Sequence, residues 1–240
     1  MPQIKYMNGK LYLIPTTLGD ENPYKVLPSD IKTVVNSMKY FLVEDVRTAR
    51  RFLKKVDPEI IIDNLDFFEI NKRTRYTDLS EFLSITQKGE DIGVISEAGC
   101  PGVADPGADA VRIAHEKGIE VKPIVGPSSI LLSLMASGLN GQSFAFAGYI
   151  PIKHPARGNT LKHLEHRVYY ENQTQIFIET PYRNNNLLHD LVRSLDDKTL
   201  LCVACDLTLE TEYIKTQPIK EWKKGVPNID KRPAIFLIGK

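Results

Sequence analysis

Apolar and polar positions alternate in two rhythms along the first half of the chain. Short apolar runs, typical of buried strands, are separated by segments whose apolar residues recur every three or four positions, as on one face of a helix. The predicted strands cover residues 11–14, 40–43, 92–95 and 120–125, and the predicted helices cover residues 47–56, 77–87 and 108–117, with a further helix that Ser29 caps and that runs to residue 38. This order predicts a mainly parallel sheet with helices on both faces.

The second half of the chain has a different texture. Residues 127–137 combine small residues with several leucines and predict a buried helix at a domain junction. Strands are predicted at residues 144–147, 175–178, 200–204 and 234–238, helices at 159–170 and 182–195, and a further extended stretch at 207–214. We therefore expect an α/β protein with two α/β domains, residues 1–124 and residues 125–240, and a ligand-binding cleft between them.

Composition narrows the class of protein. The 240 residues are 42% hydrophobic and 25% charged, which is ordinary for a folded soluble chain. No apolar run approaches the ~20 residues that span a bilayer, and the first residues do not resemble a signal peptide. Three cysteines do not form a disulfide framework, so we expect a cytoplasmic protein. Cys202 and Cys205 are expected in a buried strand as core residues, and no metal site is expected.

A loop rich in glycine and proline, residues 96–107, follows the apolar run at 92–95 and precedes the helix at 108–117. The carboxyl ends of parallel strands are where α/β proteins bind ligands, and glycine lets backbone lie close to a bound molecule. The alternative is structural, with Asp105 as a helix cap and Pro106 in the first turn. A second loop of the same kind, residues 125–129, favours a small-molecule site.

The type of ligand is narrowed by the motifs that are missing. The chain has no Gly-x-Gly-x-x-Gly fingerprint and no P-loop, so NAD and ATP are disfavoured. Loops of Ala, Ser, Pro and Gly suit a ligand such as S-adenosylmethionine, although composition alone does not decide that choice.

Positive charge is concentrated locally, although the formal net charge is only +1. In the helix at 47–56 the basic side chains form one stripe, opposite an apolar stripe, and comprise Arg47, Arg50, Arg51, Lys54 and Lys55. This stripe either follows RNA phosphates or is a solvated helix face. A second basic segment holds Lys153, His154 and Arg157, and the nearby rings of Tyr149 and Tyr182 either stack on bases or, for Tyr149 above all, pack in the core.

Six blocks of the chain, in order, resemble the tetrapyrrole methylase superfamily and, within it, the ribosomal small subunit methyltransferase I family. The blocks are residues 11–17, 43–47, 96–107, 126–129, 148–157 and 178–183. The resemblance spans nearly the whole chain. It implies two α/β domains of the tetrapyrrole methylase type, S-adenosylmethionine bound in the cleft between them, and methyl transfer to the ribose 2′-oxygen of a cytidine in 16S ribosomal RNA. It also implies a homodimer that acts on ribosomal RNA or the small subunit.

Site residues follow from the loops and from this resemblance. Cofactor contacts are expected from Ser96, Glu97, Ala98, Gly99, Pro101, Val103, Ala104, Asp105, Pro106, Ser128 and Ser129. RNA contacts are expected from Arg47, Arg50, Arg51, Lys54, Lys153, Arg157 and Arg183. The candidates for a catalytic carboxylate are Glu44, Asp45 and Glu179, and Glu97 in the cofactor loop faces the same cleft as a further candidate. Each of the first three has a structural alternative: the first two as caps of the following helix, and Glu179 as a buried ion pair with Arg183.

The chain departs from the family pattern in three places. Residues 16–21 lack the family's Asn, Glu97 replaces an Asp, and residues 205–209 lack two basic residues. Two other functions therefore stay open: methylation of a tetrapyrrole ring carbon, and RNA or ribosome binding without catalysis.

Overall fold

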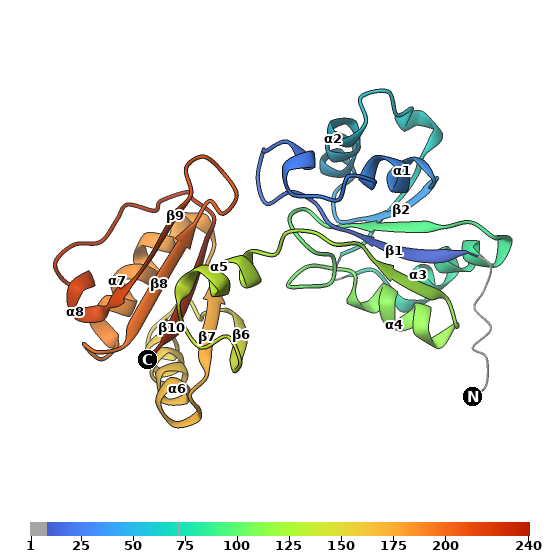
Figure 1. Ribbon diagram of the computed structural model, residues 1–240. Helices are drawn as coiled ribbons and strands as arrows, with labels where there is room; N and C mark the ends of the chain where they lie inside the picture. Colours follow the sequence, from blue (N-terminus) through green and yellow to red (C-terminus); the bar gives the residue numbers. More distant parts are fainter. Residues whose placement is uncertain (1–8, 72) are drawn as a thin grey trace. The chain divides into compact units, whose positions relative to one another are not determined.

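The computed structural model describes residues 9–71 and 73–240 (Figure 1). The chain forms two compact units, residues 1–127 and residues 128–240. From the sequence, the boundary was placed after residue 124. Each unit contains its own five-stranded sheet and its own core.

The first unit is built on a parallel sheet with strand order β3-β2-β4-β1-β5. Its strands are β1 (Lys10–Ile14), β2 (Tyr40–Val43), β3 (Asp66–Glu69), β4 (Ile92–Ile95) and β5 (Glu120–Pro123). Its helices are η1 (Pro23–Lys25), α1 (Ile31–Asn36), α2 (Val46–Val56), η2 (Ile62–Asn64), α3 (Tyr76–Leu83), η3 (Ser84–Lys88) and α4 (Ala108–Glu116). Helices α1 and α2 cover one face of the sheet, and α3 and α4 cover the other (Figure 1).

The central strand β4 is buried along its whole length, which explains its uninterrupted apolar sequence. Gly93 lies where no side chain fits, because an added Cβ would come within 2.7 Å of Ile14 and 2.9 Å of Phe41. These two neighbours belong to the core under α1 and α2. Val94, the next residue, belongs to the core under α3 and α4.

The second unit has strand order β6-β7-β10-β8-β9, in which only the β6–β7 pair is parallel. Its strands are β6 (Phe144–Tyr149), β7 (Thr174–Ile178), β8 (Leu200–Cys205), β9 (Tyr213–Pro218) and β10 (Ala234–Gly239). Its helices are α5 (Ser129–Ser137), α6 (Ala156–Glu171), η4 (Pro181–Arg183), α7 (Asn184–Ser194) and α8 (Ile219–Trp222). Helices α6, α7 and α8 share one apolar core with the sheet, and α5 packs on β9 and β10.

Several local expectations are corrected by the structure. Helix α1 has Asp30 at its N-cap, so Ser29 lies outside it. The predicted extended stretch at 207–214 is largely turn, and the strand begins at Tyr213. Helix α5 is only partly buried: Ser133, Leu134 and Ser137 are buried, whereas the side chains of Leu131 and Met135 are 51% and 78% exposed.

Cys202 and Cys205 are buried in β8, as expected for core residues. None of the helices described between residues 9 and 240 is long and apolar enough to cross a membrane.

Candidate active site

Three loops meet at the carboxyl edge of the first unit's sheet, after β1, β4 and β5. The N–H of Thr16 donates to the carbonyl of Gly99 at 2.9 Å, and the thiol of Cys100 donates to the carbonyl of Pro127 at 3.4 Å. Gly126 lies against Pro15 so closely that an added Cβ would be 2.3 Å from the proline ring. The loops therefore form one framework, with their backbones in direct contact.

The loop at 96–107 is held in a conformation that few sequences adopt. Gly99, Gly102 and Gly107 have positive φ, and Ala104 shares this left-handed region at φ 65° despite its Cβ. Helix α4 begins at Ala108 with Gly107 as its N-cap and no side-chain cap. Asp105 therefore does not cap this helix, and the structural alternative for this residue is wrong.

Glu44 follows β2 directly and is half-buried at this edge. Its Oε2 atom is buried without a hydrogen-bond partner among the described residues. Burial raises the pKa of Glu44, and the negative charges of Asp105 and Glu97 raise it further. A carboxylate in this state is a stronger proton acceptor than an ordinary surface glutamate.

Asp105 and Glu97 complete a group of three carboxylates with Glu44, here named the carboxylate cluster. Burial raises the pKa of Asp105, and the charge of Glu97 adds to that effect. Carboxylates whose charges act on one another in this way disfavour further anions and attract a cation. The buried hydroxyl of Thr16, in the adjoining loop, also has no hydrogen-bond partner among the described residues. The edge therefore suits a ligand that carries positive charge and hydrogen-bonding groups.

Asp45 has a structural role instead. Its Oδ1 accepts the N–H of Thr48 at 2.7 Å and caps α2. That hydrogen bond lowers the pKa of Asp45, so this carboxylate is a weaker base than Glu44. The helix-cap alternative accounts for Asp45 and leaves Glu44 as the open carboxylate of the pair.

The remaining residues predicted for the cofactor occupy two places. Ser96 is buried, with its hydroxyl 3.3 Å from the carbonyl of Gly99. In the same loop Pro101 is buried, whereas Ala98, Val103 and Ala104 are exposed. Ser128 caps α5 through the N–H of Leu131 at 3.5 Å, and Ser129 is the first residue of that helix, so both belong to the second unit.

In the second unit a buried ion network replaces the expected contact of Arg157 with RNA. The Arg157 side chain is only 4% exposed and donates to the carbonyl of Pro151 at 2.8 Å, to Asp190 at 2.7 Å and to Glu179 at 3.1 Å. Glu179 is 1% exposed and also accepts from Arg183 at 2.7 Å. Both arginines are thus tied to one carboxylate, and Arg157 is a structural residue rather than a surface contact.

The same network determines the proton affinity of Glu179. Burial alone raises the pKa of this carboxyl group, but the hydrogen bonds from Arg183 and Thr180 and the charges of both arginines more than offset burial. The net pKa of Glu179 is lowered, which makes it a weak base. The ion-pair alternative therefore accounts for Glu179.

The basic stripe of α2 is exposed as predicted: Arg47, Arg50, Arg51, Lys54 and Lys55 all face solvent, and Ala49, Phe52, Leu53 and Val56 are buried behind them. Arg50 lies over the ring of Phe67 at 5.5 Å, and Lys55 pairs with Asp20. In the second unit Lys153 is exposed, and Tyr149 and Tyr182 are 63% and 74% exposed. The expectation that Tyr149 packs in the core is therefore wrong.

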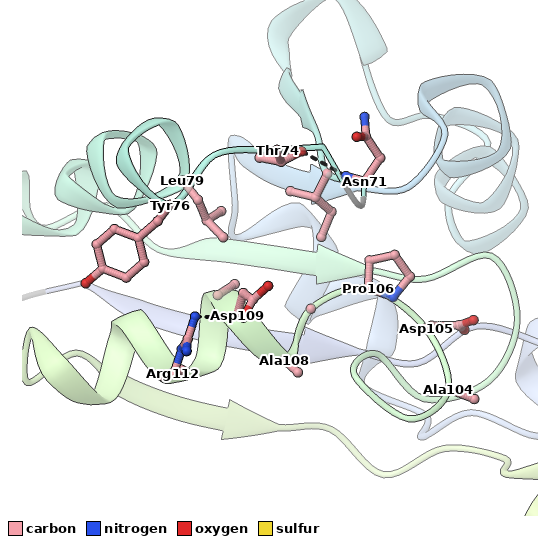
Figure 2. Close-up of a pocket in the computed structure, with 13 residues that line it drawn as sticks. Asn71, Thr74, Tyr76, Leu79, Ala104, Asp105, Pro106, Ala108, Asp109 and Arg112 are labelled. Carbon is pink, nitrogen blue, oxygen red and sulfur yellow. Dashed lines mark hydrogen bonds and ion pairs between the residues drawn. The ribbon is translucent and has the colours of Figure 1, made fainter. Parts of the chain in front are cut away.

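Sequence reasoning missed one cavity of the first unit (Figure 2). It measures about 350 Å³ and lies between the segment after β3 and the start of α4. Its lining combines residues 104–110 with Ile70, Asn71, Thr74, Tyr76, Leu79 and Arg112. These residues between 70 and 79 form no motif in the sequence, and only the fold places the ones that line the cavity beside the loop at 96–107. Within the described residues no group of His, Cys, Asp or Glu is arranged to hold a metal ion.

Comparison with known proteins places this architecture. The structure is similar to the crystal structure of the methyltransferase CobJ, with a TM-score of 0.63 and 16% sequence identity. The match covers 97% of this chain and 94% of the CobJ chain. The fold is that of the tetrapyrrole methylases, as the sequence predicted. The sequence relatives, not the fold, define the class of protein as a methyltransferase.

Sequence relatives narrow the class further, although no family model matches the chain. The chain is 32% identical over 200 residues to ribosomal RNA small subunit methyltransferase I of Synechocystis sp.. This alignment covers 83% of the chain and 67% of that protein. The chain is also 30% identical over 231 residues to the protein of the same name from Xylella fastidiosa, with 96% and 80% covered. The chain belongs to the ribosomal RNA small subunit methyltransferase I family.

Proposed function

We propose that this protein transfers a methyl group from S-adenosylmethionine to the ribose 2′-oxygen of a cytidine in 16S ribosomal RNA. The observation that carries the proposal is the carboxylate cluster at the carboxyl edge of a parallel sheet, next to an exposed basic helix. The relatives are named as small-subunit ribosomal RNA methyltransferases, which supports the same acceptor. Action on ribosomal RNA agrees with a cytoplasmic location.

The carboxylate cluster supports the choice of methyl donor. S-adenosylmethionine is a sulfonium cation, whereas NAD and ATP carry phosphates that Glu44, Glu97 and Asp105 would repel. The backbone of residues 96–106 and the unpartnered hydroxyl of Thr16 offer hydrogen-bonding groups for the donor. Ser128 and Ser129 stay predicted contacts. When bound, the donor supplies a methyl group on an electron-poor sulfur.

Glu44 is our candidate for the group that receives the proton of the ribose hydroxyl. A hydroxyl is a weak nucleophile, and a positioned base helps as negative charge develops on its oxygen. Glu44 has an unpartnered oxygen and a raised pKa, whereas Asp45 and Glu179 are engaged in a helix cap and an ion network. The carboxylate therefore accepts the proton while the loop framework holds the reacting groups in line.

The exposed stripe of α2 supports RNA as the acceptor. Five basic side chains on one face can neutralise successive phosphates, and the flat rings of Tyr149 and Tyr182 are available for stacking. Arg183 is partly exposed beside Glu179 and stays a predicted RNA contact.

We also infer that the protein acts as a homodimer. Leu131 and Met135 on α5 are largely exposed, and water-exposed apolar side chains of this size favour burial against another surface. A second copy of the chain is the occupant that the family resemblance supports.

Transfer is tested with S-adenosylmethionine labelled in its methyl group and small subunits from cells that lack this protein. We expect label at one ribose 2′-oxygen of 16S RNA. The Glu44→Gln variant should lower kcat by about 100-fold, within the range of general-base effects. Glu90→Gln, an exposed change at the amino end of β4, is the matched control. Label on another molecule, such as a tetrapyrrole, or no transfer despite donor binding, would refute the proposal.

The charge argument has its own test in donor binding. Affinity is measured by calorimetry from pH 8 to pH 4 for S-adenosylmethionine and for S-adenosylhomocysteine, which lacks the sulfonium charge. Because the pKa of Glu44 lies above its ordinary 4.5, this carboxylate is protonated early as the pH falls. The preference for the cation should then shrink. A preference that does not change with pH would contradict a role for the cluster in holding the donor.

A further inference from the structure

The cavity of Figure 2, here named the slot, has chemically different ends. Ile70, Leu79, Pro106 and the methyl groups of three alanines make most of its lining apolar. Tyr76 and Arg112 lie at one end, and Ala104 and Asp105 lie at the other (Figure 2). At about 350 Å³ the slot falls in the range of small-molecule sites.

Most polar groups around the slot already bind each other. The N–H of Asn71 donates to Thr74 Oγ1 at 2.9 Å, and Asn71 Oδ1 accepts the N–H of Arg73 at 2.8 Å. Tyr76 bonds to Glu116, and Arg112 pairs with Asp109 at 2.9 Å. Asp105 is different, since no hydrogen bond reaches its half-buried carboxylate within the part of the chain that the structure describes. The slot therefore offers one open acceptor at one end of an apolar lining.

This open end adjoins the proposed catalytic carboxylate. The N–H of Ile70, in the slot lining, donates to the carbonyl of Val43 at 2.8 Å, and Glu44 is the next residue. Val43 and Ile95 are paired in the sheet, so Glu44 and the loop that carries Asp105 leave neighbouring strand ends, and the charge of Asp105 raises the pKa of Glu44. A ligand in the slot would thus contact Asp105 directly and lie beside the strand end that carries Glu44.

We propose that this slot holds the base of the acceptor nucleotide, with Asp105 accepting a hydrogen bond from an exocyclic amino group of that base. This inference rests on the proposed function and adds where the base binds and what selects it. A flat, uncharged heterocycle matches an apolar slot, whereas a phosphate would meet two carboxylates. A carboxylate accepts from the amino group of cytosine, but it opposes the carbonyl oxygen that uracil carries in the same position. Asp105 therefore serves as a specificity residue for the acceptor.

The first test fills the slot. Ala108 lines it and is exposed at the first turn of α4, so Ala108→Phe adds a ring without disturbing the core. We expect kcat/KM for small subunits to fall at least tenfold while the Kd for S-adenosylmethionine stays within twofold. An unchanged kcat/KM would overturn the inference, and so would a loss of donor affinity, which would assign the slot to the donor. If the unaltered protein transfers no methyl group to RNA, the proposed function itself fails.

The second test concerns selectivity at saturating S-adenosylmethionine. Small subunits carrying either cytidine or uridine at the mapped acceptor position are compared for the unaltered protein, for Asp105→Asn and for Asp78→Asn. Asp78 is a control of equal charge on α3 that pairs with Arg75 outside the slot. The amide of Asn donates as well as accepts, so Asp105→Asn should reduce the preference for cytidine about tenfold or more. The same preference in all three proteins would refute the role of Asp105.

Discussion

Removal of Arg157 should destabilise the second unit strongly, although the side chain was expected on an RNA-binding surface. The Arg157→Met variant keeps a long side chain and deletes three hydrogen bonds, to Pro151, Asp190 and Glu179. Its carboxylate partner Glu179 is 1% exposed and cannot recover these interactions from water. The substitution therefore leaves a buried charge with only part of its compensation.

The expected loss follows from that burial. Deleting one partner of a buried ion pair costs about 3–5 kcal/mol of folding free energy. We expect a loss in the lower part of this range, because Glu179 keeps its interactions with Arg183 and with the N–H of Thr180. At a urea dependence of about 2 kcal/mol per M, a loss of about 3–4 kcal/mol lowers the unfolding midpoint by about 1.5–2 M. The surface pair of Arg167 with Glu171, on the same helix α6, serves as control; Arg167→Met should cost at most about 1 kcal/mol.

Urea unfolding can be followed by one intrinsic probe, because the chain has a single tryptophan and Trp222 is buried in the core of the second unit. The pKa of Glu179 is lower in the folded state than its ordinary value of 4.5. The ionised carboxylate therefore contributes fully to folding stability above pH 4.5, and this stability is lost as the pH falls through the folded-state pKa. The difference between the unaltered protein and Arg157→Met should therefore shrink below pH 4.5. A loss under 1 kcal/mol, or a double variant with Glu179→Gln whose effects simply add, would refute the reasoning.

Three further changes test the remaining features. Gly126→Ala should force the loops apart at Pro15, destabilise the protein by about 1–3 kcal/mol in a thermal melt and weaken donor binding. Gly141→Ala, whose added Cβ meets open space, is the control and should change neither property. Equal effects of the two substitutions would contradict the close approach of Gly126 to Pro15. Arg51→Glu on α2 should weaken RNA binding and reduce the slope of log K against log salt by about 1, measured by filter binding; an unchanged slope would exclude a phosphate contact. Met135→Glu should shift the sedimentation of a dimer toward monomer, and an unaltered dimer would place self-association elsewhere.

The apolar runs of central strands made much of the fold predictable. Residues 40–43 and 92–95 coincide with β2 and β4, because strands covered on both faces need continuous apolar sequence. The edge strand β3 begins and ends with acidic residues, Asp66 and Glu69, and no comparable signal marks it. The strand β9 is similarly mixed in character and was predicted too early in the chain.

The candidate site was predictable only where its residues follow a strand directly. Glu44 and the loop at 96–107 could be found in this way. The lining by Ile70, Asn71, Thr74, Tyr76 and Leu79 could not be found, since its position beside α4 depends on the packing of segments far apart in the chain. Arg157 was assigned to the surface because its two carboxylate neighbours, Glu179 and Asp190, come from β7's end and α7. Sequence spacing does not reveal that such partners converge.

The position of β10 in the second sheet has a consequence for biosynthesis. This strand, Ala234–Gly239, lies between β7 and β8 and pairs with both. The sheet therefore has a gap at its centre until residue 239 has been translated and has left the ribosome. The strands of the first unit all precede residue 124, so that unit can fold while translation continues. During that interval β7 and β8 expose unpaired backbone, and such open strand edges favour pairing with other chains.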